Sequence, residues 1–395
     1  MLETVRRYPF GEPDRMLLDP AYARLQRDEP LARVRMPYGD LALLATRHAD
    51  VRAVLADARF SRAFGRDEPR TVEQLTDGGI FSLDPPEHTR IRGLVVKAFT
   101  VRRVEQLRER TEQLADRLVD EMIAHGGPLD LVEHFALPFP VTVMCELLGV
   151  PVADRKRFGT WASVIVATTS LSPEKIVEYR ARLGIYMGRL IDRRRREPTD
   201  ADLLGALVQA RDDDDRLTED ELLHLSATLL SVGFETTSAE IPNFMYLLLT
   251  RPDLLHRLRA EPELLPTAVE ELLRYSPIAA FAMFPRYARE DVELPGGPVR
   301  AGEPVLVHTA AANRDPRVFT DPDEIDLARS PNPHLALGHG VHHCLGGPLA
   351  RMELRTMLAT LIRRLPNLRL AVTAEEIPWK TGQLIRGPQS LPVTW

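Results

Sequence analysis

The sequence has little cysteine, no strong charge bias and no long apolar run. Only two cysteines, Cys145 and Cys344, occur in 395 residues, which excludes a disulfide framework and favours a reducing cytoplasm. No stretch approaches the roughly 20 apolar residues that a membrane helix needs, and the first residues lack the apolar core of a signal peptide. A net charge of −6 is not the basic excess typical of nucleic-acid binding. We therefore expect a soluble cytoplasmic protein that binds neither membrane nor nucleic acid.

The composition is that of an ordinary folded protein. Hydrophobic residues make up 44% of the chain and charged residues 27%, which is typical of globular domains. A chain of 395 residues can bury a large core and enclose a cofactor. The 32 prolines are scattered through the sequence, and no repeat or low-complexity linker divides it. We expect a monomer that folds as a single domain over residues 1–395.

Helical periodicity dominates the sequence. Apolar residues recur at helical spacing over residues 349–365. A second, unusually long helix is predicted over residues 218–250, because Thr218 and Glu221 form a capping-box pattern. Four arginines at 193–196 end another amphipathic helix, where basic side chains favour the helix C-terminus and a surface position is expected.

Two segments have the pattern of β structure. Residues 40–46 predict a strand, and residues 292–308 predict a hairpin whose turn contains Gly296 and Gly297. With helices over most of the remaining chain, the sequence predicts a mainly α fold with a smaller β region.

The most informative segment is LGHGVHHCLGGPLAR, residues 337–351. Gly338, Gly340 and Gly346 surround Cys344. Glycine permits tight turns and close approach of the backbone to a flat ligand. Cys344 also precedes a predicted helix, whose positive end favours a thiolate. A thiolate is the form in which cysteine binds a soft metal.

Three other interpretations of Cys344 stay open on local chemistry alone. A single cysteine is most often a small buried hydrophobic residue, although that leaves the glycines unexplained. His339, His342 and His343 could join Cys344 in a zinc site, although the spaced ligand pairs typical of zinc are absent. The thiol could also be a reactive nucleophile.

The segment resembles the cysteine motif of the cytochrome P-450 family, Phe-Gly-x-Gly-x-His-x-Cys-x-Gly. The matching residues are Gly338, Gly340, His342, Cys344 and Gly346. Leu337 stands where the family usually has Phe, and we expect this difference to alter the surroundings of the sulfur. The resemblance implies a triangular helical prism around a buried haem b (iron protoporphyrin IX). It also implies that Cys344 is the iron ligand, that Gly346 lies at the cofactor and that O2 is a co-substrate.

Further segments match the family in the expected order, so the resemblance covers nearly the whole chain. Glu271 and Arg274 correspond to its Glu-x-x-Arg pair, which a later arginine, here Arg329, joins in a buried structural triad. Haem carries two propionates that need cationic or hydrogen-bonding partners. The resemblance assigns this role to His88, Arg92, Arg286 and His342.

The long predicted helix carries the segment SVGFETTSAE. Gly233 inside a helix costs about 1 kcal/mol relative to Ala, and the resemblance explains it by close approach of the helix to the oxygen site. Glu235 and Thr236 match the family's acid–alcohol pair, which delivers protons during catalysis. Val232 replaces a smaller residue and is expected to narrow the oxygen pocket, and Phe234 stands at a variable, often polar position.

The family's pocket regions, mapped onto this chain, are almost entirely apolar, as the walls of ligand sites usually are. The residues concerned are Ile80, Phe81, Leu83, Val232, Phe234, Ile278, Phe281, Met283, Leu384 and Ile385. The resemblance thus implies a monooxygenase, an oxidoreductase that inserts one atom of O2 into an apolar small molecule. Hydroxylation or epoxidation of a polyketide, macrolide or terpenoid of secondary metabolism, including antibiotic biosynthesis, is the expected reaction.

The sequence contains no flavin or iron–sulfur domain, so we expect electrons to come from a ferredoxin and a ferredoxin reductase. Two alternatives stay open. One is a haem-thiolate enzyme with other chemistry, such as oxidative coupling, rearrangement or a peroxide-driven reaction. The other is a catalytically silent haem-binding module that recruits partners, against which the intact Glu235–Thr236 pair argues.

Overall fold

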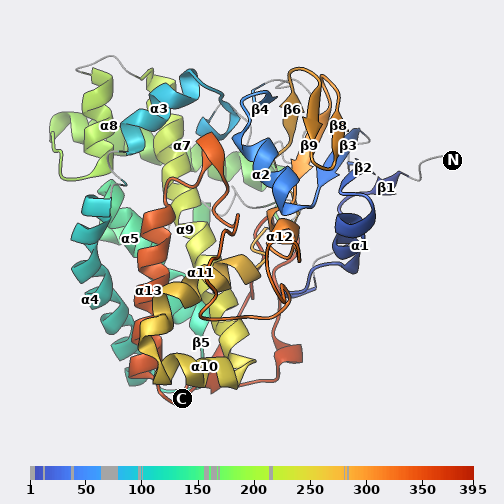
Figure 1. Cartoon of the computed structure of the whole chain (residues 1–395). Helices are drawn as coiled ribbons and strands as arrows, with labels where there is room; N and C mark the ends of the chain where they lie inside the picture. Colours follow the sequence, from blue (N-terminus) through green and yellow to red (C-terminus); the bar gives the residue numbers. More distant parts are fainter. Residues whose placement is uncertain are drawn as a thin grey trace. The chain divides into compact units, whose positions relative to one another are not determined.

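The computed structural model forms two compact units, each built from two separate stretches of the chain (Figure 1). Unit 1 comprises Met1–Asp84 and Pro266–Cys344, and unit 2 comprises Pro85–Leu265 and Leu345–Trp395. The structure describes residues 5–11, 14–36, 40–63, 79–96, 99, 101–154, 160–161, 167, 170–212, 217–279, 281–282 and 284–395.

Unit 1 contains most of the β structure. Its mixed six-stranded sheet has the order β1-β2-β3-β9-β6-β4. These strands are β1 (Arg6–Arg7), β2 (Leu31–Arg35), β3 (Leu41–Ala45), β4 (Phe60–Ser61), β6 (Arg286–Ala288) and β9 (Pro304–Val307). A separate hairpin consists of β7 (Val292–Leu294) and β8 (Gly297–Val299). The helices are α1 (Pro20–Asp28), α2 (His48–Ala56), α11 (Leu265–Tyr275), α12 (Thr309–Ala312) and the 3-10 turns η2 (Ile80–Ser82) and η8 (Gly340–His342).

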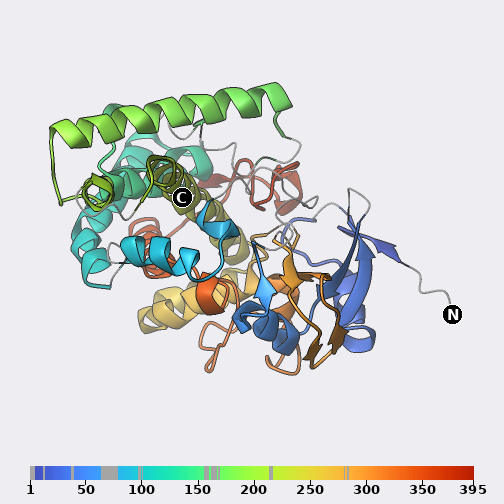
Figure 2. The same cartoon turned by 90° about the horizontal axis from the view of Figure 1, so that it is seen from above.

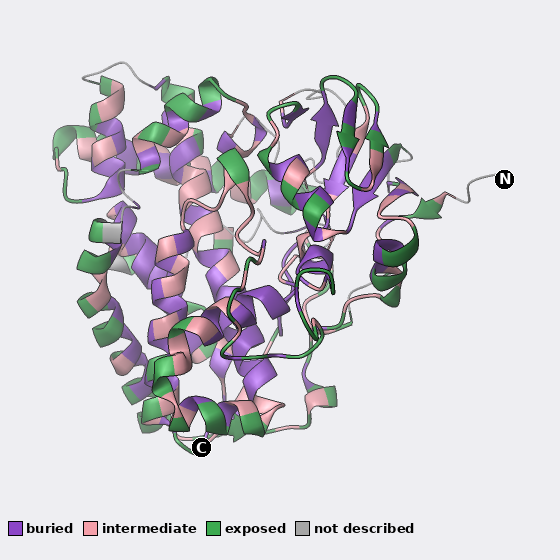
Figure 3. Cartoon of the chain, viewed as in Figure 1, coloured by how far each residue is buried: buried purple, intermediate pink, exposed green. Residues whose placement is uncertain are grey.

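The sheet of unit 1 is buried on both faces. Successive side chains of a strand point to opposite faces, and those of β3 enter two different hydrophobic clusters. Ala42 and Leu44 pack in one cluster with Tyr22 of α1, whereas Leu43 packs in the other with Val51 of α2. The purple strands in Figure 3 show this burial. Burial on both faces explains why the predicted strand over residues 40–46 is a continuous apolar run.

The prediction of one hairpin over residues 292–308 is wrong in its second half. Only β7 and β8 pair with each other, with Val292 opposite Val299. The rest of the segment forms β9, which lies between β3 and β6 with Leu306 opposite Leu44. An apolar run predicts a strand but does not say which other strand it pairs with. The pairing of β9 with β3 and β6 could therefore not be predicted from the sequence.

Unit 2 is mainly helical. Its helices are α3 (Glu87–Val96), α4 (Val101–His125), η4 (Val132–Ala136, a π-helix), α5 (Pro138–Leu148), η5 (Val152–Asp154), α7 (Pro173–Arg196), α8 (Leu203–Asp212), α9 (Glu219–Leu249), α10 (Pro252–Ala260), η7 (Pro262–Leu264), α13 (Gly347–Arg364) and η9 (Ala374–Glu376). A small sheet has the order β10-β11-β5, with β5 (Leu129–Asp130), β10 (Arg369–Leu370) and β11 (Pro392–Thr394). Figure 2 shows α7 as one unbroken helix.

The helix α9 is the centre of unit 2 and confirms the long helix predicted from the sequence. Thr218 and Glu221 make both hydrogen bonds of the capping box at its start. Helices α5, α7, α8, α10 and α13 all pack on α9, and every residue from Thr237 to Leu248 is buried. The predicted helix over residues 349–365 is also present, as α13. Among the described helices, none is both long enough and apolar enough to cross a bilayer.

The arginines at 193–196 end α7 as predicted, but two of them are not plain surface residues. Arg194 is only 11% exposed; its Nη2 lies 2.5 Å from the Asp202 carboxylate and donates to the Gly149 carbonyl at 2.8 Å. Arg195 pairs with Asp212 at the end of α8 and with Glu219 at the start of α9. Part of this basic run therefore connects neighbouring helices of unit 2.

Candidate active site

The loop before Cys344 folds back on itself within unit 1. The Cys344 N–H donates to the Leu337 carbonyl at 2.8 Å, and Gly338 and Gly340 have φ values of 73° and 71°. This left-handed backbone conformation favours glycine. A Cβ on Gly340 would also collide with the backbone of Leu55 at the end of α2. Both glycines are thus needed to present the cysteine in this conformation.

Gly346 differs from these two glycines, because neither its backbone nor its surroundings require glycine. Its φ of −79° suits any residue, and a Cβ there would meet nothing within 4 Å. It is the N-cap of α13, where glycine is acceptable. Nothing within the described structure of unit 2 requires glycine at this position.

The two cysteines have different surroundings. Cys145 is fully buried on α5, in the core as its apolar neighbours suggest, whereas Cys344 is partly exposed. The zinc alternative has no structural support: within the described ranges, no three or more His, Cys, Asp or Glu side chains are grouped to hold a metal ion.

Arg286, on β6 of unit 1, is a buried cation. Arg286 is only 5% exposed, and no described residue accepts a hydrogen bond from its guanidinium. Burial lowers the pKa of Arg286 to about 10, although the charge of Asp84 opposes this shift, so the group is cationic at neutral pH. A buried charge needs a compensating partner. This requirement fits a haem propionate, as does the partly buried position of His342 in the same unit.

The other two residues expected at the propionates lie in unit 2. His88 and Arg92 are one turn apart on α3, and therefore on one face of that helix. His88 is 2% exposed and Arg92 is partly buried. The structure thus places two of the four candidates in each unit.

The middle of α9 carries the predicted oxygen-activation segment. A Cβ on Gly233 would meet the flexible end of the Met144 side chain on α5, so α9 packs closely against α5 at this position. The Thr236 hydroxyl donates to the carbonyl of Val232, one turn earlier, at 3.3 Å. Such a bond keeps the hydroxyl on the helix until another acceptor is available.

Glu235 is the most perturbed acid of the segment. Burial raises the pKa of Glu235 from 4.5 to about 7, and the positive charge of Lys380 partly offsets this shift. Among the described residues, none makes a hydrogen bond to its carboxyl group. A carboxyl with a pKa near neutrality can both give and take a proton at the pH of a cell.

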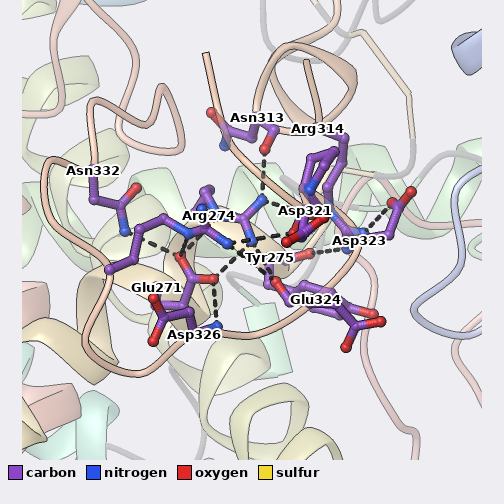
Figure 4. Close-up of polar contacts among 12 residues, drawn as sticks. Glu271, Arg274, Tyr275, Asn313, Arg314, Asp321, Asp323, Glu324, Asp326 and Asn332 are labelled. Atoms are coloured by element: carbon purple, nitrogen blue, oxygen red, sulfur yellow. Dashed lines mark hydrogen bonds and ion pairs between the residues drawn. The ribbon is translucent and has the colours of Figure 1, made fainter. Parts of the chain in front are cut away.

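Glu271 and Arg274 meet in unit 1 (Figure 4), and Arg329 joins them there. Both side chains of the α11 pair are completely buried, and Arg274 binds Glu271 through two bonds of 2.7 and 2.8 Å. Arg329 adds a third at 3.0 Å. The remaining N–H groups of Arg274 donate to the carbonyls of Asn313, Pro322 and Glu324. The cluster therefore holds the irregular segment after α12 against α11.

The expected pocket residues divide between the units. Unit 1 contains Ile80, Phe81, Leu83, Ile278 and Phe281, and unit 2 contains Val232, Phe234, Leu384 and Ile385. Met283 lies outside the described residues. Phe281 also packs against the cluster around Leu44, so part of its side chain belongs to the core. Phe234, Leu384 and Ile385 are buried.

Sequence reasoning missed an aromatic stack beside Phe81. The rings of Phe81 and Phe284 lie parallel with centroids 6.1 Å apart, and the Arg62 guanidinium lies 4.3 Å from the centroid of the Phe284 ring. The Asp84 carboxylate accepts hydrogen bonds from Ser61 and from the backbone N–H of Arg62. Phe284 ends the same apolar run as Phe281, and only the fold shows which of these rings meets Phe81.

A second missed residue is Glu353 on α13. It is completely buried beside Thr237 of α9, and neither carboxyl oxygen makes a full hydrogen bond with a described residue. Burial raises the pKa of Glu353 well above its usual value, and the nearby Thr237 side chain opposes this shift. The signal in the sequence is a carboxylate within the apolar pattern of the predicted helix.

Comparisons with known proteins identify the family. The family model for cytochrome P-450 matches residues 172–389. Mycinamicin IV hydroxylase/epoxidase of Micromonospora griseorubida is 54% identical over 392 residues, covering 99% of this chain and 98% of that protein. Nocardicin C N-oxygenase of Nocardia uniformis subsp. tsuyamanensis is 52% identical over 394 residues, with the same coverage.

A solved structure agrees with these relatives. The cytochrome P-450 hydroxylase from the leinamycin biosynthetic pathway of Streptomyces atroolivaceus superimposes with a TM-score of 0.93 at 52% sequence identity, covering 99% of this chain and all of that one. The chain therefore belongs to the cytochrome P-450 family of haem-thiolate proteins and is a bacterial P-450 monooxygenase.

Proposed function

We propose that Cys344 would hold a haem b in this chain as its thiolate ligand. The observation that carries the proposal is the loop that presents it, in which Gly338 and Gly340 adopt left-handed conformations and the Cys344 N–H turns back to Leu337. Bound in this way, the thiolate would supply electron density to the iron and so support the activation of O2.

The propionates of the haem would be bound by His88, Arg92, Arg286 and His342. Arg286 provides the clearest support, because its buried guanidinium has no hydrogen-bond acceptor among the described residues. A carboxylate bound there would compensate the charge and replace the hydrogen bonds that burial removes.

Glu235 and Thr236 would give and take the protons that the reaction needs. When bound, haem supplies the reductive activation of O2. Glu235 can donate a proton and regain one near neutral pH, because burial raises its pKa to about 7. The Thr236 hydroxyl can exchange its long bond to Val232 for one to oxygen or to an ordered water.

The substrate would be a sizeable apolar secondary metabolite of the macrolide, polyketide or terpenoid kind. The pocket candidates in both units are apolar, and the relative with 54% identity is named for hydroxylation and epoxidation of mycinamicin IV. The Phe81–Phe284 stack, covered by Arg62, would add an aromatic wall in unit 1. The nocardicin relative, named as an N-oxygenase, shows that this level of identity accommodates different reactions.

The test combines binding and oxygen labelling. A screen of macrolides, terpenoids and small charged compounds should yield haem spin-state shifts with the large apolar compounds. With a ferredoxin and its reductase under oxygen-18 gas, the product should gain one labelled atom. Products formed with peroxide alone, or by coupling without label, would favour the non-standard alternatives. Haem binding without turnover of any bound compound would favour a silent module.

A further inference from the structure

Asp84, the last residue of unit 1, is the acceptor at the centre of a hydrogen-bonded cluster. One of its carboxylate oxygens, Oδ1, accepts from the Arg62 N–H at 2.9 Å. The other, Oδ2, accepts from the Ser61 hydroxyl, from the Ala63 N–H at 3.3 Å and from the Arg289 guanidinium at 2.8 Å. A carboxylate has about four acceptor positions, so these bonds use the full capacity of the group.

The bonds of Asp84 attach the segment that ends at this residue to the edge of the six-stranded sheet. Ser61 ends the edge strand β4, and Arg289 follows β6. The two strands pair with each other, with Ser61 opposite Tyr287. Just before Asp84 in the chain, η2 carries Phe81. A change at Asp84 would therefore affect both the sheet edge and the position of Phe81.

The side chain of Arg62 completes a closed circuit of contacts. Its guanidinium lies 4.3 Å from the centroid of the Phe284 ring, which is within the range of a cation–π interaction. The Phe284 ring in turn stacks on Phe81, with centroids 6.1 Å apart and an angle of 19° between the ring planes. Asp84 is thus connected to Phe81 along the chain and to Phe284 through Arg62.

The charged groups of this cluster lie deeper than the rings. Arg62 is 8% exposed and the Asp84 side chain 13%, whereas Phe81 and Phe284 are only half-buried. Charged groups at this depth are costly unless they are hydrogen-bonded, which favours a single arrangement of the cluster. The half-buried rings keep apolar surface that a ligand can contact.

We propose that Asp84 is a positioning residue that fixes the angle and separation of the Phe81 and Phe284 rings, so that the stack favours large apolar substrates over small ones. The inference deepens the proposed function, on which it rests. Asp84 would not touch the substrate. It would act through the backbone of Arg62 and through the chain that joins it to η2.

The first test measures the rings themselves by fluorine NMR of the haem-loaded protein, in which 4-fluorophenylalanine replaces phenylalanine. The two resonances are assigned as those that Phe81→Leu and Phe284→Leu remove. Asp84→Asn keeps the size of the side chain, but its amide nitrogen cannot accept a hydrogen bond. This variant should move both resonances, and parental positions for both would overturn the inference.

Two further variants complete the fluorine experiment. Arg62→Gln leaves the Asp84 carboxylate and the backbone N–H at residue 62 in place, and it should move the Phe284 resonance; an unmoved resonance would reject action through Arg62. Asp57→Asn is the matched control in the same unit, because the Asp57 carboxylate also accepts from a backbone N–H and a guanidinium, both of Arg59. It should leave both resonances unchanged.

The second test measures selection by size, with imidazole and the much larger econazole as probes whose binding shifts the Soret band of the ferric protein. Asp84→Asn should weaken econazole binding by about three- to tenfold, the loss expected when one aromatic contact is disturbed, and should leave imidazole binding unchanged. Equal losses for both probes, or none for econazole, would reject a role in selection.

A double-mutant cycle separates action through the rings from an independent effect. In Phe284→Leu, the further change Asp84→Asn should have little effect on econazole binding, because the ring through which it acts is already absent. Losses that simply add would contradict the inference. If the parent protein forms no oxygenated product, the proposed function fails, and the fluorine resonances still decide whether Asp84 fixes the rings.

Discussion

Thr236 and Glu235 are neighbours on α9, and the proposed function gives them different roles. Thr236 is partly buried, and its hydroxyl makes a long hydrogen bond within the helix. We expect Thr236→Ala to consume electrons at a rate close to that of the parent while product falls by roughly tenfold and hydrogen peroxide rises, since general acid catalysis typically contributes factors of this order or more. Thr236→Ser is the control and should retain most product. Equal product per electron in parent and Thr236→Ala would remove Thr236 from the proton pathway.

The raised pKa of Glu235 also predicts a pH-dependent stability. Between pH 4.5 and about pH 7 the folded protein keeps a proton that the unfolded chain has lost, so the free energy of unfolding falls as the pH rises through this window. Glu235→Gln removes that loss. Its stability relative to the parent should therefore improve by up to about 3 kcal/mol between about pH 4.5 and pH 8. Urea unfolding of both proteins at the two pH values measures this difference, and a pH-independent difference would show that Glu235 titrates normally.

Individual site residues could be predicted only where a motif fixes their spacing. Two of the glycines near Cys344, Gly338 and Gly340, meet a backbone requirement of their own, because both adopt left-handed conformations. Glu353 and Phe284 were missed because each is notable only for a contact with a residue distant in sequence. Glu353 lies beside Thr237, and Phe284 stacks on Phe81. No local pattern contains that information.

At the scale of elements, the Glu271–Arg274–Arg329 cluster controls how the segment after α12 joins α11. Removing one member of a buried ion pair leaves the other charge uncompensated, which costs about 3–5 kcal/mol. We expect this loss in Arg274→Ala, together with poor haem retention. Arg329→Ala should cost less, because that side chain is partly exposed and makes one bond to Glu271.

The control for the cluster is Arg317→Ala in the same unit. Arg317 pairs with Asp315, but its side chain is 47% exposed, and exposed pairs contribute at most about 1 kcal/mol. Denaturant midpoints of the three variants rank the effects. Equal losses in Arg274→Ala and Arg317→Ala would contradict a special role for the buried cluster.

Elements with strong local signals were predictable, and those decided by distant partners were not. The capping box of Thr218 and Glu221 marks the start of α9 within one residue, and apolar spacing locates α13. The hairpin prediction failed at β9 because its pairing with β3 joins residues more than 250 positions apart. Likewise, the sequence could not show that Arg194 is held by Asp202 rather than by water.

The whole molecule has a net charge of −6. A basic patch on such a protein would attract an acidic electron donor to one particular part of its surface. Arg102 is exposed at the start of α4, and the family resemblance places this segment near the docking side for a ferredoxin. The neighbouring Arg103 is expected on the same docking side, but its side chain lies outside the described residues. If the donor is acidic, its reduction of the enzyme should slow with ionic strength and in Arg102→Glu. Arg182→Glu, an exposed arginine on α7, should have little effect. Reduction that is indifferent to salt and to Arg102→Glu would reject this docking site.

The central claim is that Cys344 is the thiolate ligand of the haem iron, and the carbon-monoxide complex of the reduced protein tests it most directly. The parent protein should show the red-shifted Soret band of thiolate ligation. Cys145→Ala should keep this band, because Cys145 is buried in the α5 core, and Cys344→Ala should abolish it even when haem still binds. A thiolate-type band that survives in Cys344→Ala, or disappears in Cys145→Ala, would contradict the account.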